Sequence, residues 1–151
     1  RLKAASSMPE EFMTGGFRPV LPDTKTLDTG AVDRVILCSG KVVWELEAAR
    51  DKRGDERTAI LRVEQLAPIP AEEIAAAVRA YPNAEVVWVQ EPQNQGAWPH
   101  MALNLPELLA SQGETRPLRV VCRPASASPA TGSHKKHEIE QADLLDRAFA
   151  R

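Results

Sequence analysis

The chain has 151 residues, of which 43% are hydrophobic and 26% are charged, and its formal net charge is −2. These values are ordinary for one globular domain that is long enough to bury a core. A slightly acidic chain gives no electrostatic reason to expect nucleic acid or an anionic membrane as a partner. No apolar run approaches the roughly 20 residues of a membrane-spanning helix, and the first residues do not resemble a signal peptide. Because the chain begins without Met, we expect a piece of a longer protein.

Residues 1–33 predict an extended arm, because proline and glycine interrupt them too often for a long element. From residue 34 to residue 151, apolar strand patterns alternate with helical patterns. Strands are expected at 34–38, 58–63, 84–89 and 118–122, and helices at 41–53, 71–81, 98–111 and 134–149. Pro106 predicts a break or a shift in the third helix. The alternation predicts an α/β fold of three layers, with a mostly parallel sheet and helices on both faces.

Two cysteines, Cys38 and Cys122, each end an expected strand. Neither belongs to a CxxC pair or lies near a histidine at the spacing of metal ligands. We expect buried, reduced thiols, which favour a cytosolic setting. A disulfide remains the alternative if the two strands are neighbours.

The most informative segment is 90–98, which reads Gln-Glu-Pro-Gln-Asn-Gln-Gly-Ala-Trp and directly follows a strand. Polar groups at the carboxyl end of a strand lie where α/β sheets usually bind ligands or partners. The alternative is a loop that only satisfies its own backbone, because Pro, Asn and Gly are common turn residues.

The segment Cys38-Ser39-Gly40-Lys41 turns from a strand into a helix. Free amides at the helix start, with the charge of Lys41, can hold an anion, although neither a P-loop nor a dinucleotide-binding pattern is present. If the strands at 34–38 and 84–89 are neighbours, Ser39, Lys41 and Gln90 converge on one anionic ligand, such as a phosphate group. Arg1 would add a second cation if the arm folds back. A plain turn is the alternative.

The remaining polar groups predict no catalytic machinery. The three histidines, His100, His134 and His137, match no metal or triad pattern. The lysines and histidines of 134–137 predict a solvated or interface surface, with an anion site as the alternative. The small-residue loop 123–132 favours close packing against another chain, and the alternative is that its hydroxyls cap a helix or bind phosphate.

Several segments together resemble one family. They are Leu37-Cys38-Ser39-Gly40-Lys41-Val42, Val63-Glu64-Gln65-Leu66-Ala67-Pro68-Ile69-Pro70, Tyr81-Pro82-Asn83-Ala84, 90–98, 123–132 and the arm from Lys3 to Val20. In this order they resemble the C-terminal domain of the thiamine-diphosphate-dependent decarboxylase component of the 2-oxoglutarate dehydrogenase complex. The resemblance covers nearly the whole chain.

The resemblance implies a transketolase-type C-terminal fold, in which one strand of the sheet is antiparallel. It implies a homodimeric parent enzyme whose thiamine diphosphate and magnesium bind between two earlier domains and not to this chain. In the family this domain buttresses the dimer and shapes the cofactor cleft. We therefore expect Trp98, Pro99, Ser126, Ser128 and Thr131 at an interface.

The segment Leu105-Pro106-Glu107-Leu108-Leu109 looks closer to actinobacterial relatives, in which acetyl-CoA activates the enzyme at a site to which this domain contributes. The pair of arginines expected after the fourth strand is here Arg123-Pro124, which departs from that pattern.

The expected parent reaction decarboxylates 2-oxoglutarate on thiamine and passes the succinyl group to lipoyl-lysine of a succinyltransferase partner, in the bacterial cytoplasm. This chain alone is expected to be inactive. The alternative is a non-catalytic regulatory module that binds CoA or a nucleotide.

Overall fold

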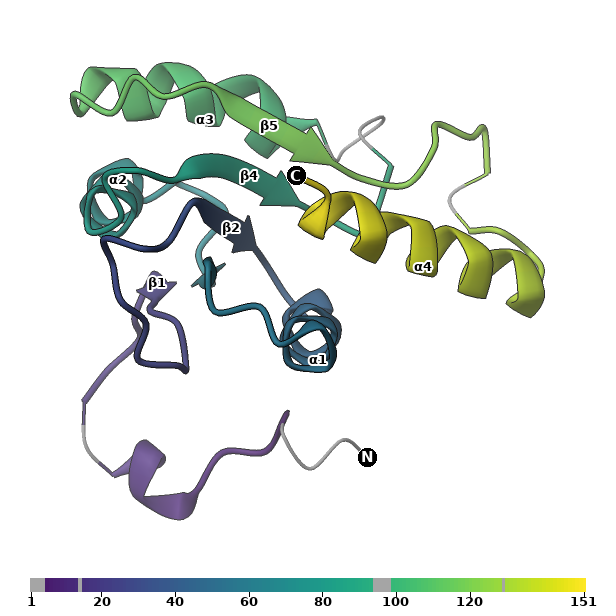
Figure 1. Ribbon diagram of the computed structural model, residues 1–151, viewed down its shortest axis with the longest axis horizontal. Helices are drawn as coiled ribbons and strands as arrows, with labels where there is room; N and C mark the ends of the chain where they lie inside the picture. Colours follow the sequence, from purple (N-terminus) through teal and green to yellow (C-terminus); the bar gives the residue numbers. More distant parts are fainter. Residues whose placement is uncertain (1–4, 14, 94–98, 129) are drawn as a thin grey trace.

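The structure, a computed structural model, describes residues 5–13, 15–93, 99–128 and 130–151. A five-stranded sheet lies between two layers of helices (Figure 1). The strands are β1 (Val20–Leu21), β2 (Arg34–Cys38), β3 (Thr58–Val63), β4 (Glu85–Val89) and β5 (Leu118–Val121). The helices are α1 (Val42–Arg53), α2 (Ala71–Arg79), α3 (His100–Ser111) and α4 (His134–Phe149), and a 3-10 turn spans Pro9–Phe12. The predicted three-layer α/β class is confirmed.

The strand order is β1-β3-β2-β4-β5, so β2 occupies the centre of the sheet. Strands β2 to β5 are parallel to their neighbours, whereas β1 is antiparallel to β3. After β2 the chain passes through α1 to β3 on one side, and after β4 it passes through α3 to β5 on the other. The direction of winding therefore reverses between β2 and β4, and this switch point is where open α/β sheets leave a crevice.

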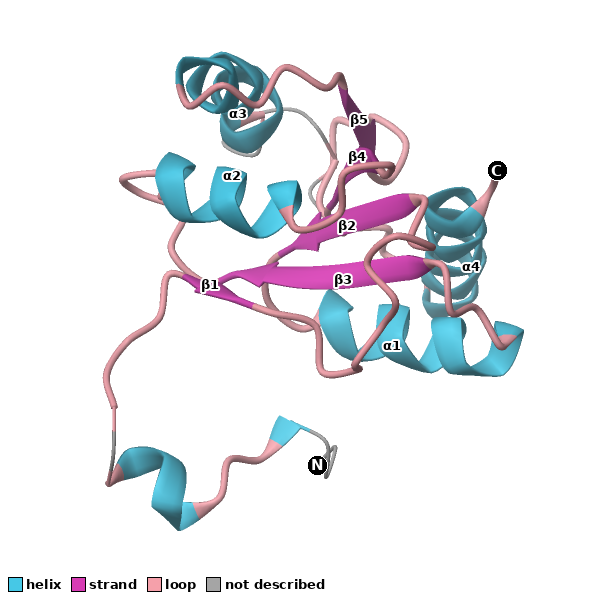
Figure 2. Ribbon diagram, turned by 60° about the vertical axis from the view of Figure 1, so that its left-hand side comes forward, coloured by secondary structure: helices cyan, strands magenta, loops and turns pink. Residues whose placement is uncertain are grey.

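Each face of the sheet has its own hydrophobic core, because successive strand residues point to opposite faces. In β2, Val35 and Leu37 face α2 and α3, while Ile36 and Cys38 face α1 and α4. The helices of the first face contribute Ile74, Ala75, Val78, Met101, Leu105 and Leu109. Those of the second contribute Val42, Val43, Leu46, Ala49, Leu144, Ala148 and Phe149. Figure 2 shows the two helical layers on opposite sides of the strands.

Most predicted elements agree with the structure to within two residues, but the expected break at Pro106 is wrong. Helix α3 continues through Pro106. A proline inside a helix removes one backbone hydrogen bond, and here Pro106 itself is exposed. The buried side chains of Met101, Leu105 and Leu109 on the other face hold the helix against the sheet.

The N-terminal segment has two parts. Residues 5–13 lie apart from the sheet in Figures 1 and 2, and Phe12, Met13 and Phe17 are exposed. The chain then joins the domain at β1, which pairs with β3 through Val20 and Val63. The sheet thus includes residues that the sequence pattern assigned to the arm.

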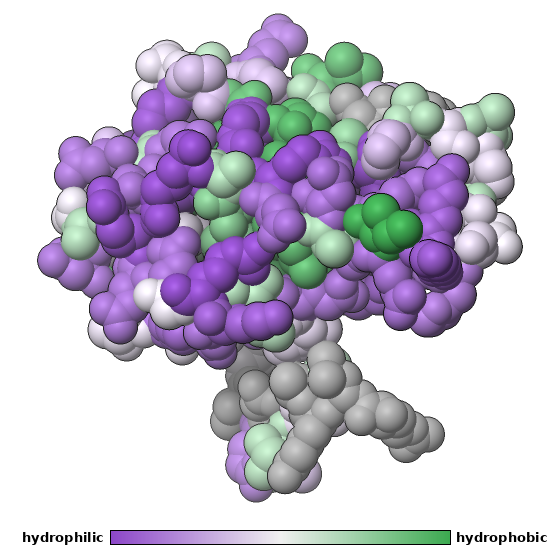
Figure 3. Space-filling view, turned by 45° about the vertical axis from the view of Figure 1, so that its right-hand side comes forward, coloured by the Kyte–Doolittle hydropathy of each residue, from purple (hydrophilic) through white to green (hydrophobic). Residues whose placement is uncertain are grey.

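Figure 3 shows one face that is mostly hydrophilic, with hydrophobic side chains in a few small areas. Leu103 on α3 and Ile139 on α4 are the large apolar side chains exposed on described helices of the domain. Among the described helices, none is both long and apolar enough to cross a membrane.

Both cysteines are free thiols. Strand β4 separates β2, which ends at Cys38, from β5, so the condition for the alternative disulfide is not met. Burial raises the pKa of the Cys38 thiol to about 12, which keeps it protonated at neutral pH. The expected burial holds for Cys38, whereas Cys122, which follows the edge strand β5, is half-buried.

Candidate functional site

A pocket of about 430 Å³ opens at the switch point between β2 and β4. Its lining comes from the segments that follow three parallel strands and from the start of α3. The lining residues are Ser39, Gly40, Lys41, Val42, Leu66, Ala67, Trp88, Gln90, Glu91, Pro92, His100 and Met101. The carboxyl ends of parallel strands meet at one edge of a sheet, which explains why segments far apart in sequence line one pocket.

The β2 side of the pocket is the tight turn 39–41. Gly40 has a φ of +72°, a left-handed conformation that favours glycine. The backbone then enters α1, and Lys41 is the N-cap residue directly before this helix. Strands β2 and β4 pair directly, as expected, with Cys38 opposite Val89. This register places Lys41 and the segment after β4 on the same rim of the pocket.

Gln90, on the β4 side, is occupied by contacts within its own segment. Its Oε1 accepts a 2.7 Å hydrogen bond from the indole N–H of Trp88. Its Nε2 donates to the carbonyl oxygens of Pro92 at 3.1 Å and Gln93 at 3.4 Å. Only 5% of Gln90 is exposed. The side chain therefore fixes the indole and the start of the loop, and it lines the pocket as a support.

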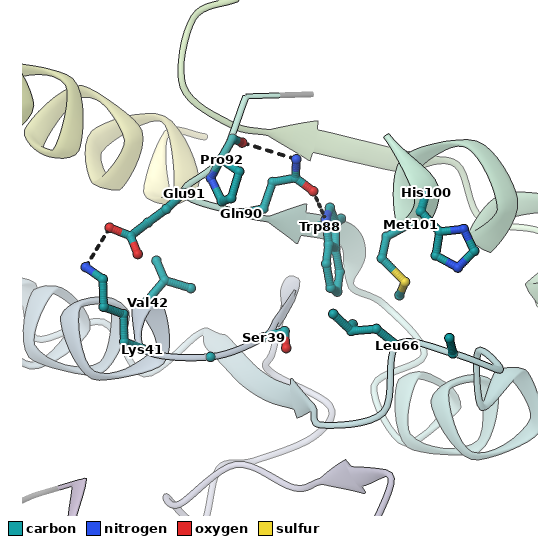
Figure 4. A pocket seen from close by; sticks show the side chains of 12 residues that line it. Ser39, Lys41, Val42, Leu66, Trp88, Gln90, Glu91, Pro92, His100 and Met101 are labelled. Atoms are coloured by element: carbon teal, nitrogen blue, oxygen red, sulfur yellow. Dashed lines mark hydrogen bonds and ion pairs between the residues drawn. The ribbon is translucent and has the colours of Figure 1, made fainter. Parts of the chain in front are cut away.

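The two ends of the pocket differ in polarity (Figure 4). At one end lie the side chains of Trp88, Leu66 and Met101, and His100 stands beside them. At the other end, Lys41 and Glu91 form an ion pair. A ligand with an apolar or planar part and a charged group would match both ends.

The ion pair at the charged end has a short contact, with 2.8 Å between Lys41 Nζ and Glu91 Oε1. This hydrogen bond raises the pKa of Lys41 above its ordinary value. Arg123, which follows β5, also reaches Glu91 Oε1 at 3.3 Å. Sequence reasoning missed Glu91 as the partner of these two cations. The signal was present, since Glu91 adjoins Gln90 at the end of a strand predicted to neighbour β2.

The small-residue loop after β5 lies against the loop after β4. Gln93 Nε2 donates to the carbonyl oxygen of Ser128 at 3.4 Å. Ser128 Oγ donates to the carbonyl of Ala130, and Thr131 Oγ1 donates to the carbonyl of Ser133. Of the expected interface residues in this loop, Ser126 and Thr131 are half-buried and Ser128 is exposed.

Other predicted positions are distributed as follows. Pro99, at the start of α3, is half-buried. Trp98 and Arg1 lie outside the described residues. His134 is exposed at the start of α4, where the Ser133 side chain accepts a hydrogen bond from the Lys136 amide. Within the described ranges, no group of three or more His, Cys, Asp or Glu side chains is arranged to hold a metal ion.

Comparison with known proteins gives a family match over most of the chain. The family described as 2-oxoglutarate dehydrogenase C-terminal matches residues 6–149. A multifunctional 2-oxoglutarate metabolism enzyme of Mycolicibacterium vanbaalenii is 44% identical over 99% of this chain and 12% of its own length. The 2-oxoglutarate dehydrogenase E1 component of Cupriavidus necator is 44% identical over 100% of this chain and 16% of its own. The 2-oxoglutarate dehydrogenase E1/E2 component of Corynebacterium glutamicum is 43% identical over 99% of this chain and 12% of its own length. The chain thus spans 12–16% of the length of these relatives.

Proposed function

The chain belongs to the 2-oxoglutarate dehydrogenase C-terminal family, and on this premise we propose that it is the C-terminal structural and regulatory domain of a 2-oxoglutarate dehydrogenase decarboxylase component. The observation that carries the proposal is the match of residues 6–149, together with 43–44% identity to relatives of which this chain is a small part. The parent polypeptide would decarboxylate 2-oxoglutarate with thiamine diphosphate and magnesium, which earlier domains would bind. It would work in the bacterial cytoplasm.

The proposed partners are the rest of the decarboxylase component, its homodimer mate and a lipoyl-bearing succinyltransferase. The interface would include Trp98, Pro99 and the loop 126–131. In the single domain Pro99, Ser126 and Thr131 are half-buried and Ser128 is exposed, so each has surface that an assembly would cover. Slower hydrogen exchange in loop 126–131 of the parent dimer than in the 151-residue chain would support the interface, and equal exchange would contradict it.

Turnover measurements test whether the catalytic cofactor site lies outside this chain. The parent polypeptide should consume 2-oxoglutarate when thiamine diphosphate and magnesium are supplied. The 151-residue chain alone should show no thiamine-dependent consumption under the same conditions, because the proposed cofactor site lies in other domains. Turnover by the isolated chain would contradict the proposal.

The pocket at the switch point is the proposed site of regulation, with acetyl-CoA as the activator. Lys41 lies at its charged end and Ser39 between the two ends (Figure 4), so a phosphate group of the activator would meet the lysine, with the serine hydroxyl farther along the pocket. The apolar end, with Trp88, Leu66 and Met101, would receive an apolar or planar part of the ligand. Gln90 would act through Trp88, whose indole it fixes.

Replacing Lys41 by Ala in the parent enzyme tests this site. The variant should require a higher acetyl-CoA concentration for half-maximal activation, by at least about tenfold, since one charge-assisted contact is removed. Turnover without activator should stay nearly unchanged. Lys52→Ala is the matched control, because Lys52 is an exposed lysine in the last turn of the same helix. If the acetyl-CoA activation curve of Lys41→Ala is unchanged, the pocket is not the site of activation.

A further inference from the structure

At the charged end of the pocket, two cations share the Glu91 carboxylate, and Lys41 Nζ also lies 3.6 Å from Glu45 Oε1. Lys41 Nζ lies 2.8 Å from Glu91 Oε1, and Arg123 NH2 lies 3.3 Å from the same oxygen. Glu91 lines the pocket, whereas Arg123 is not among its lining residues. Glu91 therefore stands between the pocket and Arg123. Figure 4 shows the Glu91 carboxylate held toward Lys41 at this end.

Arg123 is held in place by contacts that do not involve Glu91. Its NH2 group donates to Gln141 Oε1 at 2.7 Å, and it lies 3.5 Å from His137 Nε2. Gln141 in turn donates to Glu45 Oε2 at 2.6 Å. Only 11% of the Arg123 side chain is exposed. The guanidinium thus keeps its position if the Glu91 side chain rotates away.

Arg123 also has hydrogen-bonding capacity left over. Its Nε is buried and has no hydrogen-bond partner in the described part of the chain. A buried guanidinium N–H without a partner costs free energy. Lys41, in contrast, is 66% exposed, so its ammonium group can follow an incoming anion. Together the two residues form a cation pair with one fixed and one mobile member.

We propose that Glu91 is an internal competitor that occupies the anion position between Lys41 and Arg123, and that a phosphate group of a ligand in the pocket displaces it. The inference rests on the proposed function of this pocket as a regulatory site, and it adds Glu91 and Arg123 to that site. Two cations that converge on one carboxylate oxygen can equally converge on one phosphate oxygen. A phosphate carries more charge than a carboxylate and gains more from the same pair.

This arrangement sets a threshold for binding. An incoming anion must break the contacts of Glu91 before it gains its own contacts, so a free anion binds more weakly than it would without Glu91. A ligand that also fills the apolar end beside Trp88 gains additional binding free energy and passes the threshold. The cost of displacing Glu91 is common to all these anions, so Glu91 lowers the affinity for free phosphate, while the apolar end supplies the preference for phosphorylated ligands that have an apolar or planar part.

Binding of inorganic pyrophosphate to the 151-residue chain, measured by isothermal titration calorimetry, tests the competitor role. Glu91→Gln keeps the shape of the side chain and removes its charge, so it should raise pyrophosphate affinity at least about fivefold. Glu107→Gln is the matched control, because it removes one exposed glutamate on α3 and leaves the Lys41–Glu91–Arg123 cluster intact. Its affinity should equal that of the unmodified chain.

A third variant separates this inference from the proposed function. In the Glu91→Gln background, Lys41→Ala should abolish most of the gain. If Lys41→Ala weakens binding but Glu91→Gln matches Glu107→Gln, the pocket is an anion site and the competitor role is overturned. If Lys41→Ala has no effect in either background, the proposed anion site itself fails. Circular dichroism of each variant checks that its fold is retained.

Discussion

Replacing Asp23 by Asn should destabilise the chain strongly, although Asp23 precedes the first strand that sequence patterns predict. Its carboxylate forms a bidentate ion pair with the Arg50 guanidinium, in which NH1 donates to Oδ2 at 2.5 Å and NH2 donates to Oδ1 at 3.0 Å. It also accepts a hydrogen bond from the Ile60 amide at 2.6 Å. The side chain of Asp23 is 2% exposed and that of Arg50 is 0% exposed. This pair therefore ties the segment after β1 to both α1 and β3.

The expected loss follows from the buried charge that the substitution leaves behind. Removing one partner of a buried ion pair costs about 3–5 kcal/mol. Asn is similar in size and keeps one acceptor oxygen, so we expect about 3 kcal/mol, at the lower end of that range. In a chain of this length, each kcal/mol lowers the melting temperature by about 2–4 °C. Asp23→Asn should therefore lower it by about 6–12 °C.

Urea unfolding followed by tryptophan fluorescence measures this loss. Asp146→Asn is the matched control, because Asp146 pairs with Arg53 on the surface and is 76% exposed. An exposed pair contributes about 0–1 kcal/mol, so the control should stay close to the unmodified chain. If Asp23→Asn unfolds at the same urea concentration as the control, residues 19–33 do not stabilise the domain through this pair.

Two further predictions concern titration and thiol reactivity. A hydrogen bond from Arg116 holds the pKa of Glu114 below its ordinary value. Ionised Glu114 therefore stabilises the fold at any pH above the carboxyl pKa of the unfolded chain. This stabilisation is lost as the pH falls through the lower pKa of the folded chain. Glu114→Gln should therefore reduce the free energy of unfolding at pH 7 by about 1 kcal/mol. Urea titrations should show that the difference in stability between the variant and the unmodified chain shrinks below about pH 4. A difference that does not change with pH would contradict this. At pH 8, a thiol reagent should label half-buried Cys122 before Cys38, whose pKa burial raises to about 12; equal labelling rates in the folded chain would contradict the burial of Cys38.

The sequence was sufficient for the elements whose signal is local. The continuous apolar runs of β2, β3 and β4 and the turn residues between them predict these strands to within a residue. Strand β1 gave no such signal, because two residues carry no periodicity and the strand exists only through its pairing with β3. The Asp23–Arg50 pair was invisible for the same reason, since residues far apart in the chain form it.

The candidate site divides in the same way. The position of the pocket followed from strand order, and Ser39, Lys41 and Gln90 all line it. The sequence did not reveal which partners these side chains bind through hydrogen bonds and ion pairs. Gln90 bonds within its own segment, and Lys41 meets Glu91 because the register of β2 and β4 brings their ends together. Such pairings depend on side-chain geometry that residue order does not specify.

The mass of the native polypeptide tests the central claim most directly. This chain has a mass of 16.6 kDa and spans 12–16% of its relatives, so dividing the mass by that share gives about 100–140 kDa for a parent of similar size. An antibody against this chain should capture a polypeptide of that size from the cells that make it, and its peptides should include residues of this sequence. Capture of a polypeptide near 16.6 kDa, with no larger species, would contradict the account and favour a free-standing regulatory module.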